Sequence, residues 1–193
     1  MTSRLTLLLL AGTMFGTPAF SASRLTNVSV RSTAGTGSDT LIVGFTLAGT
    51  GSKPILVRGI GPTLGTFGVT GALTDPDLRL YNRANVQIAA NDNWGGTSAI
   101  VAASAAVGAF ALPAASRDAA LLAPLAAGSY STHVEAASGT GTALVEAYDT
   151  DTANPDLQIS NLSARSLSGT GASVLTVGFA ITGDTRKTVL IRA

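Results

Sequence analysis

The sequence predicts an all-β protein: an antiparallel, jelly-roll-like β-sandwich with one short alanine-rich helix, followed by a partial second repeat. Three observations support this fold. Hydrophobic residues make up 46% of the 193 residues, yet they occur in short runs punctuated by serine, threonine and 22 glycines. Some runs alternate between apolar and polar residues, as strands with one solvated face do. The beginning of the pattern also recurs later in the chain, which indicates a duplicated unit.

The duplication has an offset of 134 residues, the separation of Asn27 and Asn161. Residues 25–59 align without a gap with residues 159–193, and 15 of these 35 positions are identical. Chance would supply about two or three identities. The identical pairs include Ser29/Ser163, Arg31/Arg165, Gly44/Gly178, Phe45/Phe179 and Arg58/Arg192. Because only the start of the unit recurs, we expect a fragment of a longer tandem protein or a chain that ends on a partial unit.

Residues 1–23 are typical of a secretory signal peptide. Arg4 is the only charge before Arg24, and a leucine-rich apolar stretch follows it. Small residues permit cleavage after Ser21 or Ser23. A membrane anchor is the alternative, but a spanning helix needs about 20 apolar residues, and glycine, threonine and proline interrupt this stretch. We expect an exported protein, in the periplasm, on the cell surface or outside the cell, with no membrane span after cleavage.

The first copy, residues 24–150, is expected to contain eight strands. In chain order they cover residues 25–31, 41–47, 55–58, 77–82, 86–89, 119–125, 129–136 and 142–148. The second of these is an almost continuous apolar run, which predicts a strand covered on both faces. The seventh alternates, which predicts a wet face that carries His133 and Glu135.

Connections between these strands have their own signals. Residues 138–141, Ser-Gly-Thr-Gly, predict a short hairpin between the last two strands because glycine accepts positive φ. Residues 97–107 are rich in alanine and predict a short helix across one end of the sandwich. Polar residues 151–156, with Asn154-Pro155, predict a linker between the copies.

Residues 157–193 form the start of the second copy, with strands expected at 159–165, 175–181 and 188–192. Three strands bury little surface, and their open edges invite pairing. This segment should either dock on the first copy or stay mobile and promote self-association. The sequence favours a partly ordered tail that promotes self-association. A chain ending at Asp151 is then expected to be more monomeric and no less stable.

Two sets of motifs resemble known families. Residues 77–82, 88–96 and 125–130 resemble the bacterial pre-peptidase C-terminal domain, a small β-sandwich found beside secreted peptidases and on surface proteins. A longer pattern is more similar to a family of tandem repeats in exported bacterial proteins of unknown function. Its segments are residues 27–31, 43–45, 57–62, 75–76, 91–94 and 143–149. The resemblance implies a sandwich with a structural or accessory role, and it implies no catalytic residues.

Composition excludes several classes of function. His133 is the only histidine and there is no cysteine, so the chain cannot build a histidine-based triad, a multi-histidine metal site or a thiol nucleophile. These absences predict that the protein is not an enzyme. Only 12% of residues are charged, and removal of Arg4 would leave as many basic as acidic residues. Such a surface has no electrostatic footprint for nucleic acid.

Two groups of residues are candidate binding sites. Asp75, Asp77 and the Asn91-Asp92-Asn93 motif supply oxygen ligands that suit calcium. The alternative, which the spacing favours, is that they form turns in which side chains bond their own backbone. Trp94, the single tryptophan, is either a stacking platform for a sugar or a partner, or a core residue, and a core role is favoured.

The recurring arginines, Arg31/Arg165 and Arg58/Arg192, are expected to be structural, bonding strand-end carbonyls or a carboxylate such as Glu146 or Asp149. A ligand-binding arginine pair is the alternative.

We therefore expect a non-catalytic structural or adhesive repeat module of an exported bacterial protein, without a cofactor. Its partners would be other repeats of the same protein or a surface glycan or protein. The alternative is a glycan- or calcium-dependent binding module accessory to a secreted hydrolase.

Overall fold

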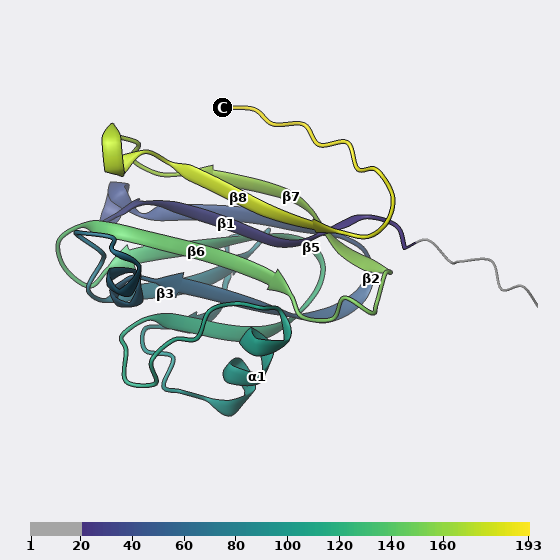
Figure 1. Ribbon diagram of the computed structural model, residues 1–193, viewed down its shortest axis with the longest axis horizontal. Helices are drawn as coiled ribbons and strands as arrows, with labels where there is room; N and C mark the ends of the chain where they lie inside the picture. Colours follow the sequence, from purple (N-terminus) through teal and green to yellow (C-terminus); the bar gives the residue numbers. More distant parts are fainter. Residues whose placement is uncertain (1–20) are drawn as a thin grey trace, which may run out of the picture.

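The computed structural model describes residues 21–193 and confirms the all-β fold (Figure 1). Most of the expected signal peptide lies outside the described residues. Eight strands pair in antiparallel fashion: β1 (Arg24–Ala34), β2 (Leu41–Ile60), β3 (Pro76–Asn82), β4 (Gln87–Asn91), β5 (Ala119–Ala136), β6 (Gly141–Asp149), β7 (Leu157–Arg165) and β8 (Thr176–Thr182). Within the described residues there is one α-helix, α1 (Ser98–Ala106), as the alanine-rich stretch predicted, but it packs on the outer face of a sheet rather than across one end of the sandwich.

Two long strands, β2 and β5, connect the two layers of the sandwich. Their pairing runs along both strands with one irregularity, between Leu47 and Ser52 on β2. Gly49 and Gly51 lie in this irregularity with φ of 129° and 81°, and these values allow the backbone to bend there. Before the bend β2 pairs with β7, and after it β2 pairs with β6. The strand therefore changes layers at the bend.

One layer thus contains β4, β3, the second half of β5, the first half of β2 and β7; the other contains the first half of β5, the second half of β2, β6, β1 and β8. The main core lies between them. Val30 of β1, Phe45 of β2, Leu80 of β3 and Val145 of β6 are each at most 1% exposed and belong to one cluster. β1 is not paired with the first half of β2, so these side chains meet face to face across the sandwich.

A second, smaller core covers the outer face of the β2–β6 layer. Leu56 of β2 and Tyr148 of β6 point outward there. They pack against a 3-10 segment, η2 (Pro62–Phe67), and against the region around α1, which contributes Trp94 and Ile100. α1 lies on the opposite side of the molecule from β8 (Figure 1).

Several expectations from the sequence were wrong in detail. The first copy has six strands rather than eight, because 41–47 and 55–58 merge into β2, and 119–125 and 129–136 merge into β5. Residues 41–47 have one buried and one half-buried face, since no layer covers the outside of β2 there. The fifth strand lies at Gln87–Asn91, slightly later than expected.

The predicted hairpin at residues 138–141 is also absent. β5 pairs with β2 and β3, whereas β6 pairs with β1 and β2, so this turn passes between the layers instead of joining neighbouring strands. In the second copy, residues 188–192 form no strand. Within residues 21–193, no helix has the length and apolar character needed to cross a membrane.

Candidate functional site at the junction of the two copies

The Asp and Asn side chains that suggested a calcium site are engaged in local contacts. Asp75 accepts a hydrogen bond from Arg117 at 3.1 Å, and Asp77 pairs with Arg79. Asn91 accepts from the backbone N–H of Ala120 at 3.0 Å and donates to the Asn93 carbonyl at 3.1 Å. Asp92 and Asn93 are exposed. Across the part of the chain that the structure describes, no three acidic or histidine side chains gather closely enough to hold a metal ion.

Trp94 lies in the smaller core and is 4% exposed. Its indole N–H donates to the Pro113 carbonyl at 3.0 Å and to Ser116 Oγ at 3.2 Å. Its backbone N–H donates to the Asp118 carbonyl at 3.0 Å. The ring is therefore almost wholly buried, and its indole N–H holds the loop around residue 113 in place.

Arg58 forms a buried ion pair, as expected from its recurrence. Its guanidinium donates to Glu146 at 2.9 Å and to the Phe110 carbonyl at 2.7 Å, and it stacks over the Phe110 ring. Tyr148 donates to the same carboxylate at 2.9 Å. Burial and the neighbouring Glu146 carboxylate raise the pKa of Tyr148, so this hydroxyl stays protonated and holds its hydrogen bond.

The sequence reasoning missed a second buried pair, Lys53 with Asp149. The two side chains have no exposed surface, and Lys53 Nζ lies 2.9 Å from Asp149 Oδ2. The ammonium also donates to the carbonyls of Asp151 and Asn154, at 3.1 and 2.9 Å. Lysine recurs at position 187, and this recurrence was the available signal. The pair ties the second half of β2 to the connection between the copies.

The two copies meet through a reciprocal exchange of strands. β1 and the first half of β2 form an arch with one strand in each layer; β7 and β8 form the equivalent arch of the second copy. Val28 and Val30 of β1 pair with Phe179 and Val177 of β8. In the other layer, Phe45 and Val43 of β2 pair with Leu162 and Ala164 of β7.

Subtraction of the 134-residue offset makes the two registers identical. When both copies are numbered as the first, residue 28 of one copy faces residue 45 of the other in each layer, and residue 30 faces residue 43 in the same way. The irregularity in the pairing also falls at equivalent places. In the β1–β8 pair it lies next to Leu25, and in the β2–β7 pair it lies where Leu47 faces Ile159, the equivalent of Leu25. Leu25 also bridges Ile159, its own equivalent. The arches are therefore related by an approximate two-fold axis.

Close contacts at this junction explain why certain residues are identical in both copies. A Cβ added to Gly44 would lie 2.5 Å from Ser163 Oγ, and one added to Gly178 would lie 2.7 Å from Ser29 Oγ. Each serine thus occupies the space that the glycine of the other copy leaves. The sequence alignment revealed these four residues, but not that they face each other.

A second pair of equivalent glycines closes the ends of the junction. Gly49 and Gly183 have φ of 129° and 118°. A Cβ on Gly49 would lie 1.8 Å from the Asp156 carbonyl, and one on Gly183 would lie 2.9 Å from the Ala22 carbonyl. Larger residues would force the two copies apart at these points.

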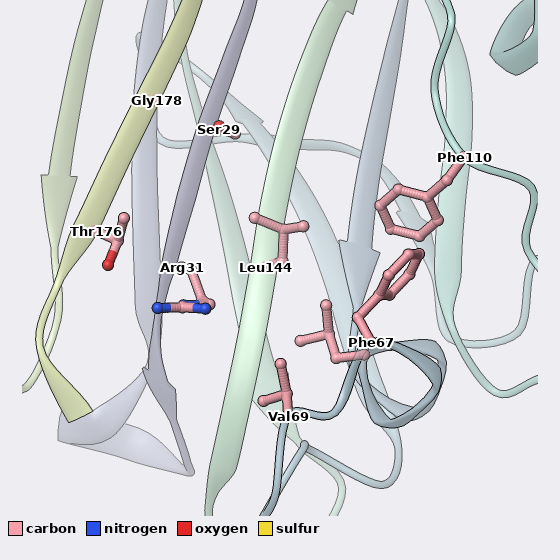
Figure 2. Close-up of a pocket in the computed structure, with 9 residues that line it drawn as sticks. Ser29, Arg31, Phe67, Val69, Phe110, Leu144, Thr176 and Gly178 are labelled. Atoms are coloured by element: carbon pink, nitrogen blue, oxygen red, sulfur yellow. The ribbon is translucent and has the colours of Figure 1, made fainter. Parts of the chain in front are cut away.

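An open groove of about 390 Å³ crosses the outer surface beside the junction (Figure 2). Thr176 and Gly178 of β8 and Arg31 of β1 line one side of it, and Phe67 and Phe110 line the other. The two aromatic rings meet edge to face with centroids 4.8 Å apart. Phe67 is 59% exposed. The groove therefore combines an exposed aromatic surface with one cationic side chain.

His133 lies on the outer face of the other layer, half-buried beside Tyr81, and the alternation predicted for its strand is present. Burial lowers the pKa of His133, and the Glu135 carboxylate opposes this effect. Arg165 of β7 and Arg79 of β3 lower it further. A charge from the second copy thus acts on the single histidine of the first.

In comparisons with known proteins, no family model and no curated protein matches this chain.

Proposed function

We propose that the protein is a non-catalytic structural or adhesive repeat module of an exported bacterial cell-surface or secreted protein, and that strand exchange between copies is how it assembles. The observation that supports this proposal is the identical register of the β1–β8 and β2–β7 pairs. Interfaces of this kind continue both sheets from one copy into the next, so that successive copies share a core. Such a chain transmits load through backbone hydrogen bonds rather than through a flexible linker.

The distribution of polar groups supports a structural role. The buried ion pairs Lys53–Asp149 and Arg58–Glu146 connect strands to each other, and their hydrogen-bonding capacity is taken up by protein groups. Asp118, also buried, accepts from the backbone N–H of Gly61 at 2.8 Å and from Thr63. These charges hold strands and turns in place.

Valine substitutions at the two equivalent glycines test the proposal. Gly178→Val places a branched side chain against Ser29, and Gly44→Val does the same against Ser163. Each should destabilise the protein by about 1–3 kcal/mol, the usual cost of overpacking. Adding Ser29→Gly to the first variant and Ser163→Gly to the second should restore much of the loss. Urea denaturation gives the stabilities.

Thr176→Val, an exposed position on β8, is the matched control and should have little effect. If both glycine variants unfold like the wild type, the strand exchange is not part of the folded protein and the proposal fails.

A ligand-binding role, the alternative from the sequence, is supported by the groove in Figure 2. An exposed aromatic ring, Phe67, in a groove with a charged group suits the apolar face and hydroxyls of a sugar. Thermal-shift measurements with a panel of bacterial surface glycans test this role. A ligand that raises the melting temperature of the wild type but not that of Phe67→Ala would establish binding at the groove.

A further inference from the structure

Three apolar residues that are buried in the first copy have equivalents in the second copy that are exposed. Ile55, Leu56 and Val57 are fully buried in β2, whereas their equivalents Val189, Leu190 and Ile191 are 42%, 82% and 73% exposed. Apolar side chains that form a core in one copy and face solvent in the other indicate an unfilled interaction surface.

In the first copy, these residues pack into the two cores, and their strand pairs with β5 along one edge and with β6 along the other. β6 lies between β1 and the second half of β2, with Val145 opposite Val30 and Glu146 opposite Arg58. In the second copy, β7 is the equivalent of β1, and residues 187–192 are the equivalent of the second half of β2. In the described part of the chain, no strand occupies the corresponding place between them.

The basic residues beside this unoccupied position also match those of the first copy. Lys53 and Arg58, which bind Asp149 and Glu146 of β6, recur as Lys187 and Arg192. Both recurring residues are exposed. A strand that fits here therefore needs two acidic residues spaced as Glu146 and Asp149 are, with apolar residues between and before them.

We propose that the free edge of β7, together with residues 187–192, is an acceptor for an extended segment with the sequence pattern of β6. Binding would add a strand to β7 by backbone pairing. It would also order residues 187–192 as the second neighbour of that strand, with Lys187 and Arg192 paired to its carboxylates. This inference rests on the proposed strand exchange, since it uses the equivalence of β7 with β1.

The occupant is not the β6 strand of an intact second molecule. That strand is already paired along both edges, with β1 and with β2. The acceptor requires a β6-type strand whose edges are free, as in an incompletely paired copy of the repeat on another polypeptide.

A synthetic peptide with the sequence of residues 141–149, labelled at its N-terminus, tests the inference by fluorescence anisotropy with the full chain. We expect saturable binding. Arg192→Glu should weaken it at least tenfold, about 1.4 kcal/mol. A peptide carrying Glu146→Lys should bind the wild type poorly and the Arg192→Glu variant well. Arg186→Glu is the matched control, because its equivalent is Ser52, which makes no ion pair, and should leave binding unchanged.

Hydrogen exchange supplies an independent measurement, since the amides of residues 188–192 should become protected only when the peptide is bound. Three results would overturn the inference. The first is binding that does not saturate at about 1 mM peptide, which corresponds to a binding free energy of only about 4 kcal/mol. The others are equal binding of a scrambled peptide, and self-association of the chain through residues 187–192 that the peptide does not disrupt. The glycine variants test the junction without the peptide, so failure of the acceptor is distinguishable from failure of the proposed function.

Discussion

The hydroxyls of Ser32 and Ser166 are hydrogen-bonded at 2.6 Å, and these serines are separated by 134 residues, the period of the repeat. Equivalent residues of two copies can touch only where the symmetry axis that relates the copies passes. Thr33 and Leu167, also equivalent, form a β-bridge next to this contact. The Leu25–Ile159 bridge marks another point on the axis. The junction is therefore an isologous interface within one chain, in which each copy offers the same surface to the other.

Removal of the second arch should destabilise the protein, contrary to the expectation from the sequence. Leu157 and Ile159 are 0% and 3% exposed and belong to the main core. Burial of each such side chain contributes about 1.5–3 kcal/mol. A chain ending at Asp151 would also expose the edges of β1 and β2. We expect it to melt at a lower temperature and to associate more, as measured by calorimetry and light scattering.

A shortened chain that is monomeric and as stable as the full chain would contradict this prediction. It would mean that the first copy folds independently and that docking of the second arch contributes nothing to its core.

The buried pair Lys53–Asp149 offers a test with an internal control. Lys53→Met leaves the Asp149 carboxylate buried without its cation, which typically costs about 3–5 kcal/mol. The equivalent Lys187→Met, at an exposed position, should change stability by less than about 0.5 kcal/mol. Equal effects of the two substitutions, in urea denaturation, would show that the environments of the two lysines do not differ as described.

Local patterns in the sequence predicted most strands, because apolar runs and alternation reflect burial on one face of a sheet. They could not predict that β2 and β5 pass from one layer to the other. The glycines around residue 50 have the same signature whether a strand ends or bends there. The hairpin expected at residues 138–141 failed for a similar reason, since a glycine turn can join strands of one layer or of two.

The junction was only partly predictable. The alignment shows that Ser29 and Gly44 are identical in the two copies. It does not indicate that each faces its counterpart in the other copy, because identity carries no information about pairing. Lys53 and Asp149 lie 96 residues apart in the sequence, and only the folded sheet brings them together.

Calcium should affect stability little. Asp75 and Asp77, the ligands suggested by the sequence, are paired with Arg117 and Arg79, and a cation would have to displace these guanidinium groups. We expect the melting temperature to change by less than about two degrees between chelator and millimolar calcium, since stabilisation by a ligand follows its affinity. A rise of about ten degrees that Asp92→Ala abolishes would instead identify a calcium site.

The last prediction uses His133 to detect the docked second copy. Its pKa lies below the usual 6.5 because burial disfavours the imidazolium, with smaller contributions from Arg165 and Arg79 and an opposing one from Glu135. A group whose pKa is lower in the folded state favours its neutral form, so its contribution to stability is present above pH 6.5 and is lost as the pH falls through that value toward the folded pKa. The wild type should therefore lose more stability than His133→Gln between neutral and mildly acidic pH.

Because His133 is the only histidine, its ring protons give one NMR titration curve without assignment. Arg165 belongs to β7, so its effect depends on the second arch lying beside β2. Arg165→Gln should raise the pKa of His133, whereas Arg186→Gln, outside the paired strands, should leave it unchanged. A wild-type midpoint at or above 6.5 would show that His133 is not buried as described, and a midpoint that Arg165→Gln does not move would show that β7 does not lie beside His133 in solution.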